Sequence, residues 1–99
     1  MGFEYKITAK FTGKQITEIQ YLFENDKTFD KKYEFNNKTF WDFRQPGNNG
    51  TMPNISIIFE NDGIYICQYS SSYVWKDLDL LKTYIENENI EYEIIDYQD

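Results

Sequence analysis

The chain has 99 residues, with 17 acidic side chains, 10 basic ones, a single cysteine and no histidine. This length allows one domain, which we expect to span residues 1–99 without a second catalytic domain. The lack of histidine excludes Ser-His-Asp and Cys-His catalysis and imidazole-bound zinc. One cysteine can form neither an intramolecular disulfide nor a thiolate metal cage.

The net charge of −7 is concentrated in the last quarter of the chain. Residues 1–45 carry eight basic and seven acidic side chains, whereas residues 74–99 carry two lysines and eight acids. Proteins that bind the nucleic-acid backbone draw much of their affinity from Lys and Arg contacts to phosphate. We therefore expect no direct binding to nucleic acid.

The N-terminal residues alternate apolar and polar side chains and contain no continuous apolar stretch. A signal peptide or a membrane span needs such a stretch. This pattern predicts a cytoplasmic location and no association with membranes.

The first half of the chain predicts three strands and a helix. Residues 3–11 alternate apolar and polar positions, which is typical of a strand with one solvated face. Thr12 and Gln15 form a capping-box pattern before apolar residues at helical spacing, so we predict a helix over about 13–24. Residues 29–35 and 38–44 alternate again, and the Asn36-Asn37 pair between them suits a tight turn.

The second half predicts a loop, a hairpin, a helix and a last strand. Residues 45–54 contain both prolines and no charge, which indicates the one long loop. Residues 55–60 and 64–69 form a hairpin around Asn61-Asp62-Gly63. Residues 70–72 are serines that offer N-caps to a second helix, with an apolar stripe of Val74, Leu78, Leu81 and Ile85. Residues 90–97 are predicted to be the final strand.

The resulting order is β-α-β-β-β-β-α-β. It predicts an α+β two-layer sandwich, in which a mostly antiparallel six-stranded sheet carries two helices on one face. Two helices cover only part of such a sheet, so some of the other face is expected to contact water or a partner.

The sequence contains no assembled catalytic motif. Cys67 lies in a predicted strand with no basic residue within eight positions, which favours a structural role over a reactive thiol. Asp77 and Asp79 diverge on a helix, and no Asp-rich metal loop, Gly-rich phosphate cradle or nucleophile elbow occurs. We therefore predict no enzyme activity, no cofactor and no metal site. The alternative is a carboxylate hydrolase, which needs two acids to converge in a cleft near Arg44.

Two segments near the middle of the chain are candidate binding elements. In residues 40–44, Trp41 and Phe43 share one face, and aromatic residues with an arginine often anchor protein interfaces. Trp41, Phe43 and Arg44 are therefore candidate partner-binding residues, with core filling as the competing interpretation. Arg44 is expected to bind an anion or to pair with Asp42 or a C-terminal acid. The loop 45–54 is either a recognition element or a solvated connection.

The acidic C-terminal unit is the third candidate. On a helix followed by a strand, its carboxylates are expected to form one negative surface that steers a basic partner toward it. A solubilising face is the competing interpretation. The predicted partner-binding residues of this unit are Glu86, Glu88, Glu91, Glu93, Asp96, Tyr92 and Tyr97.

These observations favour a non-catalytic inhibitor that binds a basic, nucleic-acid-handling protein. In size, charge and lack of catalytic machinery the chain resembles toxin-immunity proteins and phage-encoded inhibitors of host defence, which implies a bacterial or phage source. One alternative is a small-ligand-binding or regulatory module with an aromatic pocket of Trp41, Phe43, Tyr65 and Tyr69. The second is the carboxylate hydrolase described above.

Overall fold

The computed structural model describes residues 2–97 and has the predicted α+β element order. Its helices are α1 (Gly13–Glu24) and α2 (Asp79–Asn87). Its strands are β1 (Phe3–Ala9), β2 (Phe29–Phe35), β3 (Lys38–Phe43), β4 (Ile55–Glu60), β5 (Gly63–Gln68) and β6 (Tyr92–Asp96).

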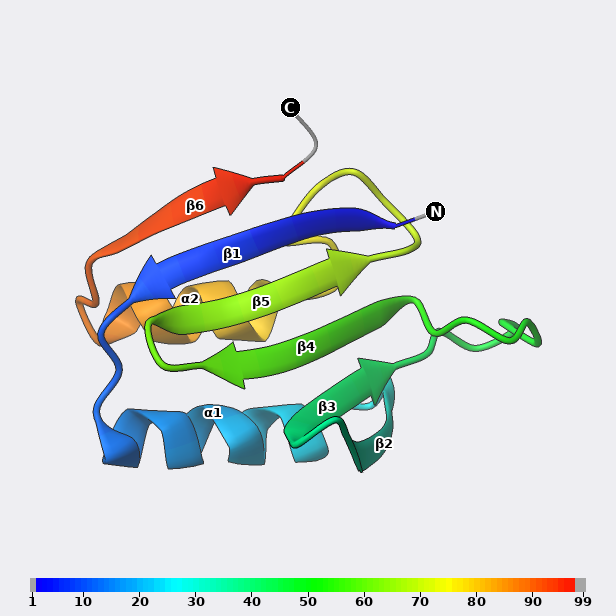
Figure 1. The fold of residues 1–99 in the computed structure, drawn as a ribbon, viewed down its shortest axis with the longest axis horizontal. Coiled ribbons are helices and arrows are strands. Elements are labelled where there is room, and N and C mark those ends of the chain that lie inside the picture. Colours follow the sequence, from blue (N-terminus) through cyan, green and yellow to red (C-terminus); the bar gives the residue numbers. More distant parts are fainter. Residues whose placement is uncertain (1, 98–99) are drawn as a thin grey trace.

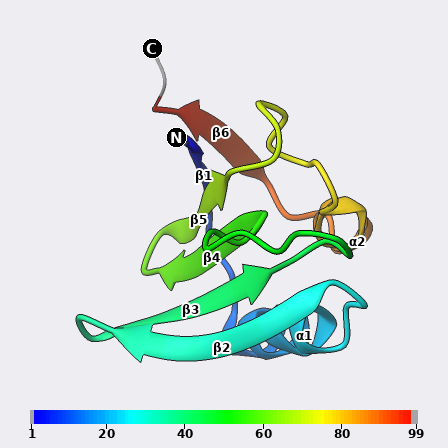
Figure 2. The same ribbon diagram turned by 90° about the vertical axis from the view of Figure 1, so that its right-hand side faces the viewer.

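The six strands form one sheet in the order β2-β3-β4-β5-β1-β6, and every neighbouring pair is antiparallel (Figure 1). β2 and β6 are therefore the two edges of the sheet. Both helices lie on the same face, at the right of the sheet in Figure 2. The predicted two-layer arrangement is confirmed.

The core lies between the sheet and the two helices. Alternate residues of the four central strands point to this side, as period-two alternation requires, and meet the apolar faces of the helices. The largest fully buried side chains of this core include Ile7, Ile19, Phe43, Ile55, Ile57, Ile64, Ile66, Leu81 and Ile85.

Helix α1 begins where the capping box predicts. The Thr12 hydroxyl accepts a hydrogen bond from the backbone N–H of Gln15 at 3.1 Å. The Gln15 side chain accepts one from the backbone N–H of Thr12 at 2.9 Å. These reciprocal bonds satisfy donors that the first turn of a helix otherwise leaves unpaired.

Helix α2 begins later than predicted, and the serine caps are wrong. The helix starts at Asp79, its N-cap residue Leu78 makes no side-chain capping bond, and Asp77 has a φ of 60° that interrupts a right-handed helix. The buried Gln68 amide instead donates to the carbonyls of Val74, at 3.1 Å, and Lys76, at 2.8 Å. This side chain holds residues 70–78 in an irregular turn that still buries Val74 and Leu78.

Several strands begin or end one or two residues away from the predicted positions. β1 ends at Ala9, β3 at Phe43 and β5 at Gln68, whereas β6 begins only at Tyr92. Ile90 does not extend β6 because its N–H donates to the carbonyl of Ile85 at the end of α2. In the described part of the chain, no helix combines the length and the apolar character needed to cross a membrane.

The face of the sheet opposite the helices is open, as predicted. A row of aromatic and aliphatic side chains crosses it, and Tyr33 and Phe40 stack there with ring centroids 5.1 Å apart. The strand pairings place this row in register, in the order Tyr33, Phe40, Ile58 and Tyr65.

Candidate functional site

Trp41 and Phe43 lie in the core. Each is 2% exposed, and both point to the helix side, where the Phe43 ring meets Phe23 edge-on at 5.4 Å. The Trp41 indole N–H donates to the Glu24 carboxylate at 3.2 Å. A partner could contact neither ring in this conformation, so the core-filling interpretation describes both residues and we leave them out of the proposed site.

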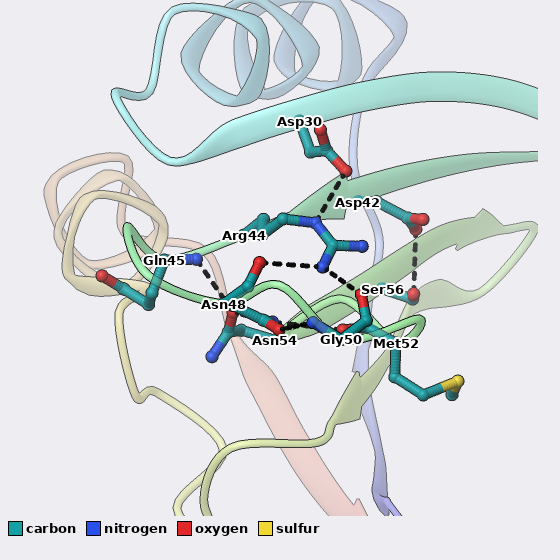
Figure 3. A network of polar contacts seen from close by, with 9 residues as sticks. All are labelled: Asp30, Asp42, Arg44, Gln45, Asn48, Gly50, Met52, Asn54 and Ser56. Atoms are coloured by element: carbon teal, nitrogen blue, oxygen red, sulfur yellow. Dashed lines mark hydrogen bonds and ion pairs between the residues drawn. The ribbon is translucent and has the colours of Figure 1, made fainter.

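Arg44 anchors the loop 45–54 (Figure 3). Its guanidinium donates to the carbonyls of Asn48, at 3.3 Å, and Gly50, at 2.8 Å, and pairs with the Asp30 carboxylate at 3.3 Å. The expected pairing with Asp42 or a C-terminal acid is wrong, because Asp42 points to the open face and accepts from the Ser56 hydroxyl instead. Arg44 therefore serves to shape the loop.

The loop itself is ordered by side-chain amides. Asn54 accepts from the backbone N–H of Gln45 and from the Asn48 amide, at 2.8 and 2.7 Å, and Asn48 also donates to the carbonyl of Met52 (Figure 3). With Tyr69 the loop lines a shallow hollow of about 470 Å³. The composition of residues 45–54 predicts a loop but not this internal network, which brings together residues up to nine positions apart.

Three of the predicted acidic residues meet at one open depression of about 810 Å³. Glu88, Glu91 and Glu93 line it together with Tyr92, at the junction of α2 and β6. The opposite wall comes from the end of β1, the start of α1 and the β4–β5 turn. We call this the acidic depression; it is lined by Thr8, Ala9, Lys10, Thr12, Gln15, Asn61, Asp62, Glu88, Asn89, Ile90, Glu91, Tyr92 and Glu93.

The sheet adds Asp62 and Lys10 to this depression, and sequence reasoning missed both. Asp62 lies in the β4–β5 turn, and its carboxylate binds the Lys6 ammonium, which lowers the pKa of Asp62. Lys6 also pairs with Glu60 at 3.1 Å. The charge of Asp62 is therefore largely balanced. By contrast, Glu88, Glu91 and Glu93 take part in none of the ion pairs found in residues 2–97.

The remaining predicted residues of the acidic unit lie elsewhere. Asp96 is in register with Tyr5, whose hydroxyl pKa is raised by burial and then by the Asp96 charge. Tyr97 lies across from Tyr65, with ring centroids 6.3 Å apart, and Glu86 does not line the depression. The expectation of one surface holding all the carboxylates is therefore corrected: Asp96 pairs with Tyr5 at the far end of β6 from Glu93, which pairs with Thr8.

The four aromatic residues of the alternative pocket do not share a face. Trp41 and Phe43 point to the helices, whereas Tyr65 is in register with Ile58 and Phe40 on the open face. The strand pairing therefore places Trp41 and Tyr65 on opposite sides of one sheet, where they cannot line a common cavity.

The groups that the predicted carboxylate hydrolase needs do not meet at one place: Glu88, Glu91 and Glu93 line the acidic depression, whereas Arg44 anchors the loop 45–54. Within residues 2–97, no three His, Cys, Asp or Glu side chains are grouped so that they could hold a metal ion. Cys67 is buried, and this burial raises the pKa of its thiol, as expected for a structural cysteine. Asp42 is 3% exposed and accepts from the Ser56 hydroxyl at 2.8 Å, while burial raises the pKa of its carboxyl.

Comparison with models of protein families, with curated protein sequences and with solved structures found no match.

Proposed function

We propose that this chain is a non-catalytic cytoplasmic protein that binds a basic, nucleic-acid-handling protein and blocks it. The observation that carries the proposal is the acidic depression. Glu88, Glu91 and Glu93 are exposed there and form no ion pair with any lysine or arginine among residues 2–97. Toxin-immunity proteins and phage inhibitors of host defence, which the chain resembles in size and charge, are the corresponding classes.

Electrostatics supports a basic partner. Three carboxylates that form no ion pair among the described residues line the depression, and Lys10 is the one cationic side chain among its described lining residues. Clustered charges of one sign create a field that steers an oppositely charged protein toward the cluster and raises its association rate. A surface that binds phosphate through Lys and Arg is complementary to such a cluster, because carboxylates also accept charge-assisted hydrogen bonds.

The shape of the site supports a protein partner. A volume of about 810 Å³ admits several side chains, and its walls mix the carboxylates with Ile90 and Tyr92. Apolar surface next to charge is typical of protein interfaces, in which an aromatic or aliphatic contact excludes water from the ionic ones.

Affinity capture tests this proposal. Immobilised wild-type protein, Glu91→Lys and Glu86→Lys are exposed in parallel to a lysate of the native host. Glu86→Lys makes the same change in charge on α2 but does not line the depression. We expect the wild type and Glu86→Lys to retain a basic nucleic-acid-binding protein that Glu91→Lys loses.

The captured protein is then assayed for nucleic-acid binding or cleavage with each variant added. Inhibition by the wild type and by Glu86→Lys, but not by Glu91→Lys, is the expected result. Retention of the same proteins by all three baits would contradict a site at the depression. Capture without inhibition would contradict the blocking role.

A further inference from the structure

The edge strand β2 is exposed along its length. Among residues 2–97 it pairs only with β3, and six of its seven residues are exposed. In Figure 2, β2 (cyan) is the lowest strand, with no strand beyond it. A free edge presents a row of unpaired backbone N–H and C=O groups that can pair with another strand.

The turn between β2 and β3 shows which backbone groups are free. Asn36 and Asn37 have φ angles of 54° and 64°, which identify a two-residue type I′ turn. The residues that flank such a turn form a hydrogen-bonded pair, and bonded and non-bonded pairs alternate along an antiparallel ladder. Phe35 and Tyr33 therefore face β3 with their backbone groups, whereas Lys32 and Glu34 direct theirs to the open edge.

The side chains at these two positions are of opposite charge. Lys32 is held on the helix side, 3.7 Å from the Glu24 carboxylate and 5.3 Å from the centre of the Trp41 ring. Glu34 shares this side of the strand and forms no ion pair among the described residues. Strand β2 thus offers one ordered cation and one unpaired anion, each beside outward backbone groups.

Only one central register of self-pairing satisfies these charges. A two-fold axis perpendicular to the sheet pairs β2 antiparallel with itself and keeps the helices of both copies on one face. An axis at Lys32 sets two lysines opposite each other, and an axis at Glu34 sets two glutamates opposite each other. An axis at Tyr33 sets each Lys32 opposite Glu34 of the second copy, with their outward backbone groups in hydrogen-bonding register.

We propose that β2 pairs with β2 of a second copy of this chain, in the register centred on Tyr33, to form one continuous sheet. Two-fold pairing of identical surfaces is the commonest form of closed assembly. The other edge is unsuited to it, because self-pairing of β6 would gather Glu91, Glu93 and Asp96 of both copies at one seam. This inference is independent of the proposed function, since β2 and the acidic depression lie at opposite edges.

Sedimentation velocity over a wide range of protein concentration tests the dimer. We expect wild-type protein to show a monomer–dimer equilibrium, and Glu34→Lys to raise its dissociation constant about tenfold or more, because two lysines then face each other at both positions. Glu86→Lys makes the same change in charge on α2 and is expected to dimerise like the wild type.

A charge-swap mixture tests the register. Lys32→Glu is combined with Glu24→Gln, which avoids a new like-charge contact on α1. This variant and Glu34→Lys are each expected to be monomeric and folded by circular dichroism. Mixed in equal amounts they should form a heterodimer, because the glutamate introduced in one variant then faces the lysine introduced in the other. The native Glu34 of the first variant likewise faces the native Lys32 of the second.

Two results would overturn the inference. Lysines and bulges on edge strands can also prevent pairing, and β2 has an irregularity between Phe29 and Lys31. If the wild type stays monomeric at the highest concentration, the lysines and the irregularity of β2 protect this edge from pairing. A dimer that Glu34→Lys leaves intact, or variants that fail to associate on mixing, would place the interface elsewhere.

Discussion

Of the glycines, Gly63 leaves the least room for a side chain. A Cβ placed there would lie 2.0 Å from the Ile7 carbonyl oxygen and 3.0 Å from the Thr8 Cα, both backbone atoms of β1. Since β1 and β5 pair in the middle of the sheet, neither strand can move aside without disturbing the core. Glycine is therefore required here for close approach of the two backbones.

We expect Gly63→Ala to lower the free energy of unfolding by more than about 2 kcal/mol, the range of substitutions that force backbone strain. Gly13→Ala is the matched control, because a Cβ at Gly13 meets nothing within 4 Å. Chemical denaturation measures both. A Gly63→Ala variant as stable as the Gly13→Ala control would show that β1 and β5 do not pair as described.

Asp42 makes the stability of the fold depend on pH. Burial raises the pKa of its carboxyl above the ordinary value of 3.8, although the Ser56 hydrogen bond and the Lys31 charge oppose part of this rise. The folded state then holds the proton more tightly than the unfolded state. The contribution of Asp42 to stability is therefore complete below pH 3.8 and is lost as the pH rises through the folded-state pKa.

We accordingly expect Asp42→Asn to be more stable than the wild type at neutral pH, with the difference shrinking as the pH is lowered toward 3.8. The amide oxygen can still accept from Ser56 but carries no charge that burial penalises. Urea denaturation at a series of pH values measures this difference, with the exposed Asp79→Asn as a control. A difference that does not vary with pH would contradict the assignment.

Among the elements, those with a clear period were predicted well, because one buried face leaves a readable pattern. The alternation of β1 and the helical spacing of α1 are examples, and β4 and β5 were found from the turn residues between them. The start of α2 was mispredicted because it depends on Gln68, which lies in the preceding strand and binds the carbonyls of Val74 and Lys76 through space. No local pattern reports a contact of this kind.

The segment between β5 and α2 should therefore depend on Gln68. Gln68→Leu keeps the size of the side chain but removes the donor, which leaves the Val74 and Lys76 carbonyls without their partner. We expect a loss of about 1–3 kcal/mol in the free energy of unfolding, the usual cost of an unsatisfied buried polar group. Hydrogen exchange should show faster opening in residues 70–78. Unchanged exchange there would mean that the turn does not need this amide.

At the scale of the whole molecule, the sequence located part of the candidate site. Glu88, Glu91 and Glu93 are neighbours along the chain, so a local count of charges found them. Asp62 reaches the same depression only because β1 pairs with both β5 and β6, which brings the β4–β5 turn beside the start of β6. Asp96 was misplaced because the pairing of β6 with β1, and not charge, decides its position: it lies opposite Tyr5, at the far end of β6 from the depression.

The sheet thus presents two edges of different character. β6 adjoins a depression rich in unpaired carboxylates, whereas β2 combines Lys32 with Glu34 along a free backbone edge. The proposed site for a basic partner and the proposed dimer seam do not overlap, because the whole width of the sheet separates them.

The most direct test of the central claim is the association rate constant of the captured partner, measured against ionic strength. For the wild type we expect fast association at low salt that slows steeply as salt is added, since steering by the acidic depression is screened. Glu91→Lys with Glu93→Lys should associate about tenfold or more slowly at low salt and depend less on salt. Equal association rate constants for the wild type and this double variant at every ionic strength would contradict a binding site at the acidic depression.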